Sequence, residues 1–428
     1  MSLPYLVFSD KQGKIYQHPY LRMAISSLNL PGLPNKQELI KVPKGSSFLY
    51  LPGRIPLGYN LQTENFEFVR EFKKKKVFAL AAFPIPAYLR LCHPAAVVLS
   101  KKVLPLWAYT ACGLLGNDLY ITATRVDPRV RQSPRFYNFK QINRKVIHFL
   151  KKYPDNRLYK HLANCALNYN CLAAKNLFLE RWEAPLPVAQ MCNADCLGCI
   201  SYQKAGCIAS HKRIAFQPKS KEVVEVMNHH LTVAREAIVS FGQGCEGEPL
   251  LEEKLISQSV INVRKKNSRG TININTNASI PKKIKLLCSA GVDSFRVSLN
   301  SPSEKFYNLY FNPKNYKFKD VVKSIAIAKR HNKFVAINLF MFPGFSDSDQ
   351  QINSLKKFIK NNGIDMIQWR NLNIDPVYYL EKMNLKNVRP LGMLFLLEEI
   401  KKYFPLLKTG YFNIPREEFK SLKKYQSY

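Results

Sequence analysis

The chain has 428 residues, 46% of them hydrophobic and 12% aromatic, which indicates a well-folded globular protein of two or three domains. Its 65 Lys and Arg residues against 30 Asp and Glu residues give a formal charge of +35, which would suit an anionic partner such as tRNA. No Arg-rich arm or tail concentrates this charge, so we interpret it as a solvated basic surface rather than a nucleic-acid platform.

Cysteine usage and the absence of targeting signals indicate the compartment. The ten cysteines are too few and too clustered for the disulfide framework of a secreted protein. The N-terminal stretch MSLPYLVFSD has neither the basic nor the apolar region of a signal peptide. The longest uncharged apolar run, residues 77–89, is shorter than the ~20 residues that a membrane helix needs. We therefore expect a cytoplasmic protein that has no membrane partner.

Residues 1–137 are predicted to form a β-rich domain, because short apolar runs end at turn residues and prolines disfavour long helices. The clearest hairpin pairs residues 106–114 with residues 119–126 across Gly116-Asn117-Asp118, residue types that tolerate positive φ. Four arginines in or beside the following loop are expected to be solvated, with phosphate binding as the alternative. They are Arg125, Arg129, Arg131 and Arg135.

Residues 138–183 are predicted to form a helical linker. One helix is indicated by apolar residues at helical spacing, namely Ile142, Val146, Ile147 and Leu150. A second helix is expected over residues 158–173.

From residue 184 to residue 376 strands and helices alternate, which is typical of a parallel sheet. The expected strands cover residues 185–190, 237–241, 271–276, 295–299, 334–340 and 366–370. The intervening helices are expected over residues 221–234, 250–266, 281–289, 320–331 and around 352–359, with Asp320 as an N-cap. The fold class is therefore α/β, a partial (β/α)6 TIM-type barrel, followed by a short, basic helical extension over residues 377–428.

Polar residues alternate with apolar ones along the barrel strands. Helices cover the outside of such a barrel, so the apolar side chains must point outward and the polar ones into the lumen. An ordinary closed barrel fills this space with branched apolar side chains. A lumen lined with Asn, Ser, Gln and Arg therefore predicts a polar ligand or water inside, because buried polar groups need partners.

Cys192, Cys196 and Cys199 have the spacing C-x-x-x-C-x-x-C, which places three thiolates in one loop. A 4Fe–4S cluster held by only three cysteines leaves one iron with an open position, whereas electron-carrier ferredoxins supply four ligands. On spacing alone, two alternatives stay open. One is a zinc site completed by Cys207 or His211, and the other is three buried thiols.

With the motifs downstream, this loop resembles the radical S-adenosylmethionine (SAM) superfamily. Gly247-Glu248-Pro249 is similar to the family's glycine–glutamate motif, Thr276-Asn277-Ala278 to its Thr-Asn-Gly, and Ser298-Leu299-Asn300 to its strand-four segment. The resemblance covers residues 183–376, under half of the chain. One departure is Gly198, where the family has an aromatic residue that packs near the adenine, and Tyr202 is a candidate replacement.

The resemblance implies a 4Fe–4S cluster on Cys192, Cys196 and Cys199 and a SAM molecule bound at the open iron. One electron from a donor such as flavodoxin or ferredoxin would cleave SAM to a 5′-deoxyadenosyl radical, which abstracts hydrogen from a substrate that the sequence does not identify. The implied SAM contacts are Gly247, Glu248, Asn275, Asn277, Ser298, Asn300, Asn338 and Arg370. The alternative function is a non-catalytic zinc or iron–sulfur module that binds nucleic acid.

A second iron–sulfur cluster is a further hypothesis. If the helical linker folds over the mouth of the barrel, four cysteines can meet there, namely Cys165, Cys171, Cys207 and Cys245. The alternative is that these thiols are scattered and buried as small apolar groups, the interpretation given to Cys92, Cys112 and Cys288.

Overall fold

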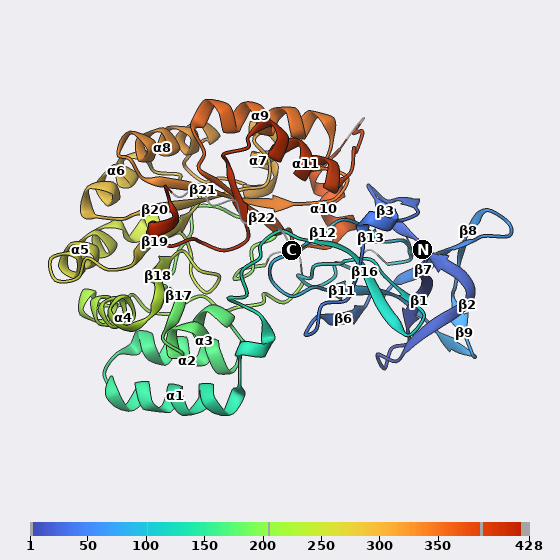
Figure 1. Cartoon of the computed structure of the whole chain (residues 1–428), viewed down its shortest axis with the longest axis horizontal. Helices are drawn as coiled ribbons and strands as arrows, with labels where there is room; N and C mark the ends of the chain where they lie inside the picture. Colours follow the sequence, from blue (N-terminus) through green and yellow to red (C-terminus); the bar gives the residue numbers. More distant parts are fainter. Residues whose placement is uncertain (1–2, 101, 204–205, 386–387, 421–428) are drawn as a thin grey trace.

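The computed structural model describes residues 3–100, 102–203, 206–385 and 388–420. Figure 1 shows a β-rich part built from the first third of the chain, in blue and cyan, beside a larger α/β part, in green to red. Three helices at one side of the α/β part connect the two. In the described ranges, none of the helices combines the length and the apolar character that a bilayer-spanning segment requires.

The N-terminal part is antiparallel, with an 11-stranded sheet whose main path runs β12-β16-β15-β1-β2-β7-β14. The strands of the whole N-terminal part are β1 (Tyr5–Ser9), β2 (Ile15–Met23), β3 (Ile25–Ser27), β4 (Leu30–Gly32), β5 (Leu39–Lys41), β6 (Ser47–Tyr50), β7 (Arg54–Asn60), β8 (Asn65–Phe68), β9 (Glu71–Phe72), β10 (Lys75–Lys76), β11 (Phe78–Phe83), β12 (Tyr88–Arg90), β13 (His93–Pro94), β14 (Ala96–Val98), β15 (Cys112–Leu115) and β16 (Asp118–Arg125). Two 3₁₀ turns, η1 (Lys36–Glu38) and η2 (Pro134–Phe136), accompany them. The prediction of a β-rich N-terminal region is confirmed.

The predicted hairpin is present as β15 and β16, which pair antiparallel with Leu115 opposite Asp118. Gly116 takes a φ of 61° in the turn, a conformation that glycine adopts without steric cost. The first strand is shorter than expected, because it begins at Cys112 rather than at residue 106. Tyr109 has a φ of 46°, which is incompatible with a continuous strand there.

The linker contains three helices rather than two. They are α1 (Phe139–Lys152), α2 (Arg157–Leu167) and α3 (Leu172–Phe178). Asn138 and Asn156 begin α1 and α2, and the side-chain oxygen of each accepts a backbone N–H of the first helical turn. The helix expected over residues 158–173 breaks between α2 and α3, where Asn170 has a φ of 54°.

The α/β part contains one seven-stranded sheet in sequence order, β17-β18-β19-β20-β21-β22-β23, and every neighbouring pair is parallel. The strands are β17 (Arg181–Pro185), β18 (Arg235–Phe241), β19 (Thr271–Thr276), β20 (Ser294–Leu299), β21 (Phe334–Met341), β22 (Met366–Asn371) and β23 (Lys408–Gly410). The sheet curls into a partial barrel with helices on its outer side (Figure 1). The partial TIM-type barrel is thus confirmed.

The helices that follow the barrel strands match the expected pattern with one addition, α7. They are α4 (Ser220–Val233), η3 (Pro249–Glu252), α5 (Glu253–Arg264), α6 (Pro281–Ala290), α7 (Glu304–Phe311), α8 (Phe318–Arg330), α9 (Asp349–Asn362), α10 (Pro376–Met383), α11 (Met393–Tyr403) and η4 (Arg416–Glu418). Gly291 and Gly363 end α6 and α9 in the left-handed conformation. Asp320 is not the N-cap of α8. Lys317 occupies that position, and its backbone N–H donates to the Asp320 carboxylate at 2.9 Å.

Two expectations for the ends of the barrel are wrong. The first strand covers Arg181–Pro185 rather than residues 185–190, and the chain beyond Pro185 leaves the sheet toward the cysteine loop. The C-terminal region is not only helical, because β23 adds a seventh strand beside β22. After β23 the chain turns across the barrel, and the Asn413 side chain enters the lumen. There its amide bonds to Gln368 at 2.8 Å and to Glu183 at 2.7 Å.

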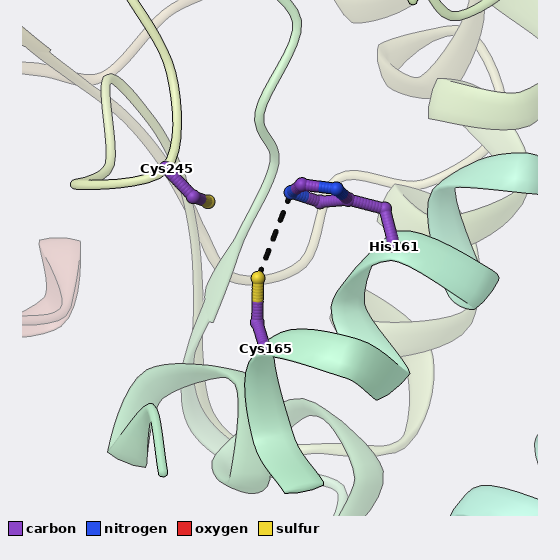
Figure 2. A group of neighbouring side chains, drawn as sticks. All are labelled: His161, Cys165 and Cys245. Carbon is purple, nitrogen blue, oxygen red and sulfur yellow. Dashed lines mark hydrogen bonds between the residues drawn. The ribbon is translucent and has the colours of Figure 1, made fainter. Parts of the chain in front are cut away.

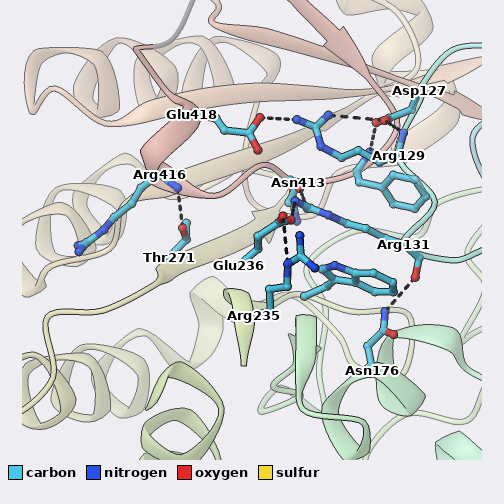
Figure 3. A network of polar contacts seen from close by, with 12 residues as sticks. Asp127, Arg129, Arg131, Asn176, Arg235, Glu236, Thr271, Asn413, Arg416 and Glu418 are labelled. Atoms are coloured by element: carbon cyan, nitrogen blue, oxygen red, sulfur yellow. Dashed lines mark hydrogen bonds and ion pairs between the residues drawn. The ribbon is translucent and has the colours of Figure 1, made fainter. Parts of the chain in front are cut away.

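Of the four arginines in or beside the loop after β16, Arg125 and Arg135 are exposed as expected, whereas Arg129 and Arg131 are covered (Figure 3). The side chains of Arg129 and Arg131 are only 11% and 4% exposed, because the C-terminal segment packs over them. Arg129 pairs with Glu418, and Arg131 donates to the Asn413 carbonyl at 2.6 Å and to Glu236 at 2.8 Å. These arginines fasten the C-terminal segment to the start of the barrel sheet.

The β-rich part is joined to the barrel by a buried ion pair. Arg54 of β7 donates to the Asp375 carboxylate at 3.0 Å, and the two side chains are 5% and 1% exposed. Asp375 also accepts the backbone N–H groups of Leu104 and Val377, at 2.9 Å each. Three donors from two parts of the chain therefore compensate one buried carboxylate.

Replacing Arg54 with Ala should destabilise the protein strongly, because the Asp375 carboxylate would stay buried without its counter-charge. We expect a loss of about 3–5 kcal/mol in the free energy of unfolding, measured by urea denaturation. The matched control is Lys41→Ala. Lys41 pairs with Asp118 at 2.6 Å, but these side chains are 66% and 54% exposed, so no measurable change is expected. Equal effects of the two substitutions would contradict this account.

Acidification should weaken the attachment of α4 to the sheet. His230 of α4 is fully buried and contacts the Trp182 carbonyl through Nε2 at 2.8 Å, and burial lowers its pKa from 6.5 to about 4. The unfolded chain therefore binds this proton more readily, and stability is lost as the pH falls below 6.5 toward 4. From about pH 8 to about pH 5 the free energy of unfolding should fall by about 2 kcal/mol, and His230→Gln should not show this fall. Urea unfolding of His230→Gln measures this difference. If that variant lost as much stability on acidification as the original protein, the account would be refuted.

Candidate active site at the mouth of the barrel

The loop with Cys192, Cys196 and Cys199 lies against the end of α7, at the mouth where the barrel strands end. Asp195 and Leu197 donate their backbone N–H groups to the carbonyls of Phe311 and Tyr310, at 3.0 and 2.9 Å. The three thiols are half-buried. Their positions therefore depend on α7, a helix that the sequence analysis did not predict.

Protein surroundings disfavour the charged form of two of these thiols. Burial raises the pKa of Cys192 to about 11, with the Glu248 carboxylate as a second cause. Burial also raises the pKa of Cys196 well above its usual range, and the neighbouring thiols add to the effect. Arg213 is the nearby cation, with Nη2 at 3.7 Å from the Cys199 sulfur. A bound metal centre would supply the positive charge that thiolates need here.

The three sulfurs do not lie close enough together for a single zinc ion. A tetrahedral zinc ion with Zn–S bonds of about 2.3 Å brings its sulfur ligands within about 4 Å of one another. Within the part of the chain that the structure describes, the three thiols do not form a set whose ligand atoms all lie within 4.8 Å. Each cysteine of a 4Fe–4S cluster binds a different iron, so its sulfurs stand further apart.

A buried carboxylate that the sequence analysis overlooked, Glu246, fixes the loops around the cysteines. It accepts the backbone N–H groups of Val188 and Ala189, ahead of the cysteine loop, at 2.8 and 3.1 Å. It also accepts those of Gly242 and Gln243, after β18, at 2.5 and 2.8 Å. Burial raises its pKa to about 7, while these bonds oppose the shift. The Glu246 carboxylate thus connects the segment that follows β17 to the segment that follows β18.

Gly247 is required by the protein rather than by a ligand. A Cβ at this position would lie 1.9 Å from the Met191 carbonyl oxygen, at the start of the cysteine loop. The Gly247 N–H donates to the Ala189 carbonyl at 2.7 Å, and the Glu248 N–H donates to Met191 at 2.8 Å. Gly247, which the resemblance implies as a SAM contact, lies here against the backbone of the cysteine loop.

Glu248 is buried and attaches the same segment to the end of β19. Its carboxylate accepts the Asn277 N–H at 2.8 Å, the Leu250 N–H at 3.1 Å and the hydroxyl of Thr276. Burial raises its pKa to about 7. Since an ionised carboxylate has about four acceptor positions, about one is left for a further donor.

The other residues that the motifs point to are brought to one side of the sheet, with different partners. Asn277 bonds to Asn193 of the cysteine loop at 2.8 Å, and Asn300 donates to the Phe306 carbonyl at 3.1 Å. Asn275 accepts from Asn273 at 2.8 Å, but its Nδ2 is buried without a partner. The buried Oδ1 of Asn338 also has no partner among the described residues. Ser298 is half-buried on β20.

The lumen toward the other end of the sheet is filled by protein groups. Asn273, Ser240, Asn413 and Gln368 form a chain of amide and hydroxyl hydrogen bonds. The expectation that the lumen polar groups need a ligand is therefore too general, because the Asn413 side chain satisfies several of them.

Two arginines give the lumen a positive character. Arg296 and Arg370 both donate to the side-chain oxygen Oε1 of Gln368, at 3.3 and 3.5 Å, and the Nε atom of each is buried without a partner in the described structure. Burial lowers the pKa of Arg296 to about 9, and the charge of Arg370 lowers it further. Arg370 also stacks on Tyr411 at 3.9 Å. The pair is suited to an anionic group entering from the mouth.

Tyr310 occupies the space beside Gly198. A Cβ at Gly198 would meet the Tyr310 hydroxyl at 2.8 Å, so the glycine is needed to admit this ring. Tyr310 is 2% exposed and comes from α7, more than a hundred residues further along the chain. Tyr202 lies beside a hollow of about 340 Å³ that also borders Cys196 and Lys382. An aromatic ring therefore adjoins the third cysteine even though the sequence has none next to it.

The four cysteines proposed for a second cluster do not form one set. Cys165 and Cys245 lie together with His161, and the three ligand atoms are within 4.8 Å of one another (Figure 2). Cys207 is elsewhere and donates to the Gln203 side chain at 3.6 Å. Cys171 is half-buried at the start of α3, and its side chain makes no capping hydrogen bond to that helix. The described structure thus brings Cys165 and Cys245 together with His161, and it does not show the four cysteines as one ligand set.

Comparison with known proteins identifies the domain. Residues 186–355 match the family model described as Radical SAM superfamily. No curated protein matches the chain in sequence.

Three solved structures are similar to parts of the chain. SuiB of Streptococcus suis, bound to its precursor peptide SuiA, is 16% identical, with 59% of this chain and 52% of SuiB covered and a TM-score of 0.39. The FeFe-hydrogenase maturase HydG of Carboxydothermus hydrogenoformans is 11% identical, with 63% and 69% covered and a TM-score of 0.38. A radical SAM methyltransferase of Sphaerobacter thermophilus is 13% identical, with 54% and 66% covered and a TM-score of 0.38. The chain thus spans about half the length of SuiB, and residue roles do not transfer at such similarity.

Gly247→Ala should prevent normal assembly of the metal centre, because the added methyl group collides with the Met191 carbonyl and displaces the cysteine loop. Iron and sulfide, assayed after anaerobic reconstitution, should fall from about four each per chain to less than about half. Gly32→Ala is the matched control, since its Cβ would meet nothing closer than 3.9 Å. Full iron loading of Gly247→Ala would contradict the steric argument.

Proposed function

We propose that this chain, which carries a radical SAM superfamily domain, is an enzyme that reductively cleaves SAM and abstracts a hydrogen atom from its substrate. The observation that carries the proposal is the loop of three cysteines at the mouth of a parallel barrel, beside buried polar atoms that lack partners among the residues that the structure describes. A zinc or iron–sulfur module that binds nucleic acid needs neither that lumen nor the Gly247–Glu248 segment.

Cys192, Cys196 and Cys199 would hold the 4Fe–4S cluster. When bound, this cluster supplies the electron that splits SAM into methionine and a 5′-deoxyadenosyl radical. The protein keeps the three thiols in one loop through the backbone bonds to α7. The same packing leaves the three thiols half-buried.

The polar side chains at the mouth would bind SAM. Glu248 has acceptor capacity left for an ammonium group, and charge-assisted hydrogen bonds of this kind are the stronger ones. The unpartnered atoms of Asn275 and Asn338 are a donor and an acceptor that a polar ligand can satisfy. Gly247, Asn277, Ser298 and Asn300 complete the proposed surroundings. The Tyr310 ring would take the packing role of the aromatic residue that Gly198 replaces.

The substrate would enter from the same mouth, toward Arg296 and Arg370. We assign Arg370 to the ligand-binding lumen, where its guanidinium and that of Arg296 favour a group with negative charge. An electron donor such as flavodoxin or ferredoxin would deliver the electron from outside, near Cys196, where the hollow bordered by Lys382 reaches the surface of the loop.

The decisive experiment is SAM cleavage by the full chain. Anaerobically reconstituted protein with dithionite should release 5′-deoxyadenosine, measured by liquid chromatography and mass spectrometry. Cys192→Ala, Cys196→Ala and Cys199→Ala should each abolish release. The matched control is Cys288→Ala, since Cys288 is a buried thiol of α6 outside the site. A variant lacking all three loop cysteines that still forms 5′-deoxyadenosine would refute the proposal.

A further inference from the structure

A cluster of metal-ligating side chains lies outside the cysteine loop, between α2 and the segment of residues 245–248. His161 and Cys165 are four residues apart on α2, which places them on one face of the helix. Figure 2 shows both side chains directed toward Cys245, which comes from the loop after β18. The Nε2 atom of His161 is 3.6 Å from the Cys165 sulfur, and all three ligand atoms lie within 4.8 Å of one another.

A second histidine lies near the same cluster. The Nδ1 atom of His211 is buried and has no hydrogen-bond partner in the described structure. Its ring lies 5.6 Å from that of Tyr169, just beyond the end of α2, and Ile214 of the same segment donates its backbone N–H to the Cys245 carbonyl at 2.8 Å. A buried imidazole nitrogen without a partner is costly, and a bound ion would satisfy it.

We propose that His161, Cys165, Cys245 and His211 bind a single divalent transition-metal ion of the zinc type. The donor set of two sulfurs and two imidazole nitrogens is one that tetrahedral structural zinc sites use. The three ligand atoms already within 4.8 Å need to move inward by only about 1 Å to reach zinc-like separations.

The charge balance favours this ion over a second iron–sulfur cluster. On binding, Cys165 and Cys245 each release one thiol proton to solvent and no electron is transferred. Two thiolates, two neutral imidazoles and one divalent cation sum to zero charge. Neutrality matters because Cys165 and Cys245 are only 1% and 4% exposed, and an uncompensated buried charge is unfavourable.

The location gives the ion a structural role. Cys245 directly precedes Glu246, Gly247 and Glu248, which hold the cysteine loop and the end of β19. A metal bond from Cys245 to α2 would attach this segment to the helical linker from outside the barrel. The site therefore ties the linker to the mouth without touching SAM or the substrate, so the proposal does not depend on the proposed function.

The test measures metal in the full chain and in the variant in which Ala replaces Cys192, Cys196 and Cys199. Both should retain about one zinc ion per chain by mass spectrometry of the metals after purification and dialysis. Zinc should be lost in Cys165→Ser, Cys245→Ser and His161→Ala and weakened in His211→Ala. Cys288→Ser is the matched control and should keep its zinc.

A second measurement does not depend on the folding of the ligand variants. Cobalt(II) added to the metal-free triple variant should give thiolate-to-cobalt charge-transfer bands and the intense visible bands of tetrahedral cobalt. It should also raise the melting temperature. Absence of zinc together with no cobalt spectrum would overturn the proposal. Iron and sulfide in the triple variant, or a Cys165–Cys245 disulfide in place of a metal, would do the same. Unchanged zinc affinity in His211→Ala would overturn the fourth ligand.

Discussion

The arrangement of the site depends on one buried carboxylate, that of Glu246. It accepts four backbone N–H groups, two from the chain entering the cysteine loop and two from the chain leaving β18. Without these donors the carboxylate would be too costly to bury, and without the carboxylate four buried N–H groups would lack partners. Its neighbours extend the same function: Gly247 admits the Met191 backbone, and Glu248 binds the end of β19.

The remainder of the chain supports this mouth through two long-range contacts. Arg54 ties the β-rich part to Asp375, which begins α10 beyond the last large barrel strand. Arg131, from the loop after β16, binds the backbone of Asn413, whose side chain fills part of the lumen. These contacts join residues hundreds of positions apart in sequence, which makes the mouth the product of the whole chain rather than of the barrel alone.

Electrostatics inside the molecule differ from what the overall charge suggests. The net +35 is dispersed along the chain, while two arginines, Arg296 and Arg370, lie in the lumen with only partial compensation. Near the cysteine loop the protein instead disfavours negative charge, because burial and the Glu248 carboxylate disfavour a thiolate at Cys192. A metal centre and an anionic ligand would therefore each meet a complementary local field.

The sequence by itself determined the elements that local pattern controls. Alternating apolar residues located the five strands β18 to β22 to within a few residues, and glycines with left-handed conformations end α6 and α9. Only the tertiary structure decided the rest, because those features join residues that no local pattern connects. β23 has three residues and no apolar periodicity, and it is a strand only because β22 pairs with it. His161 joins Cys165 and Cys245, and Tyr310 fills the space beside Gly198, because α2 and α7 pack where they do. Arg131 looks solvated in the sequence and is buried in the fold, since burial depends on what the distant C-terminal segment covers.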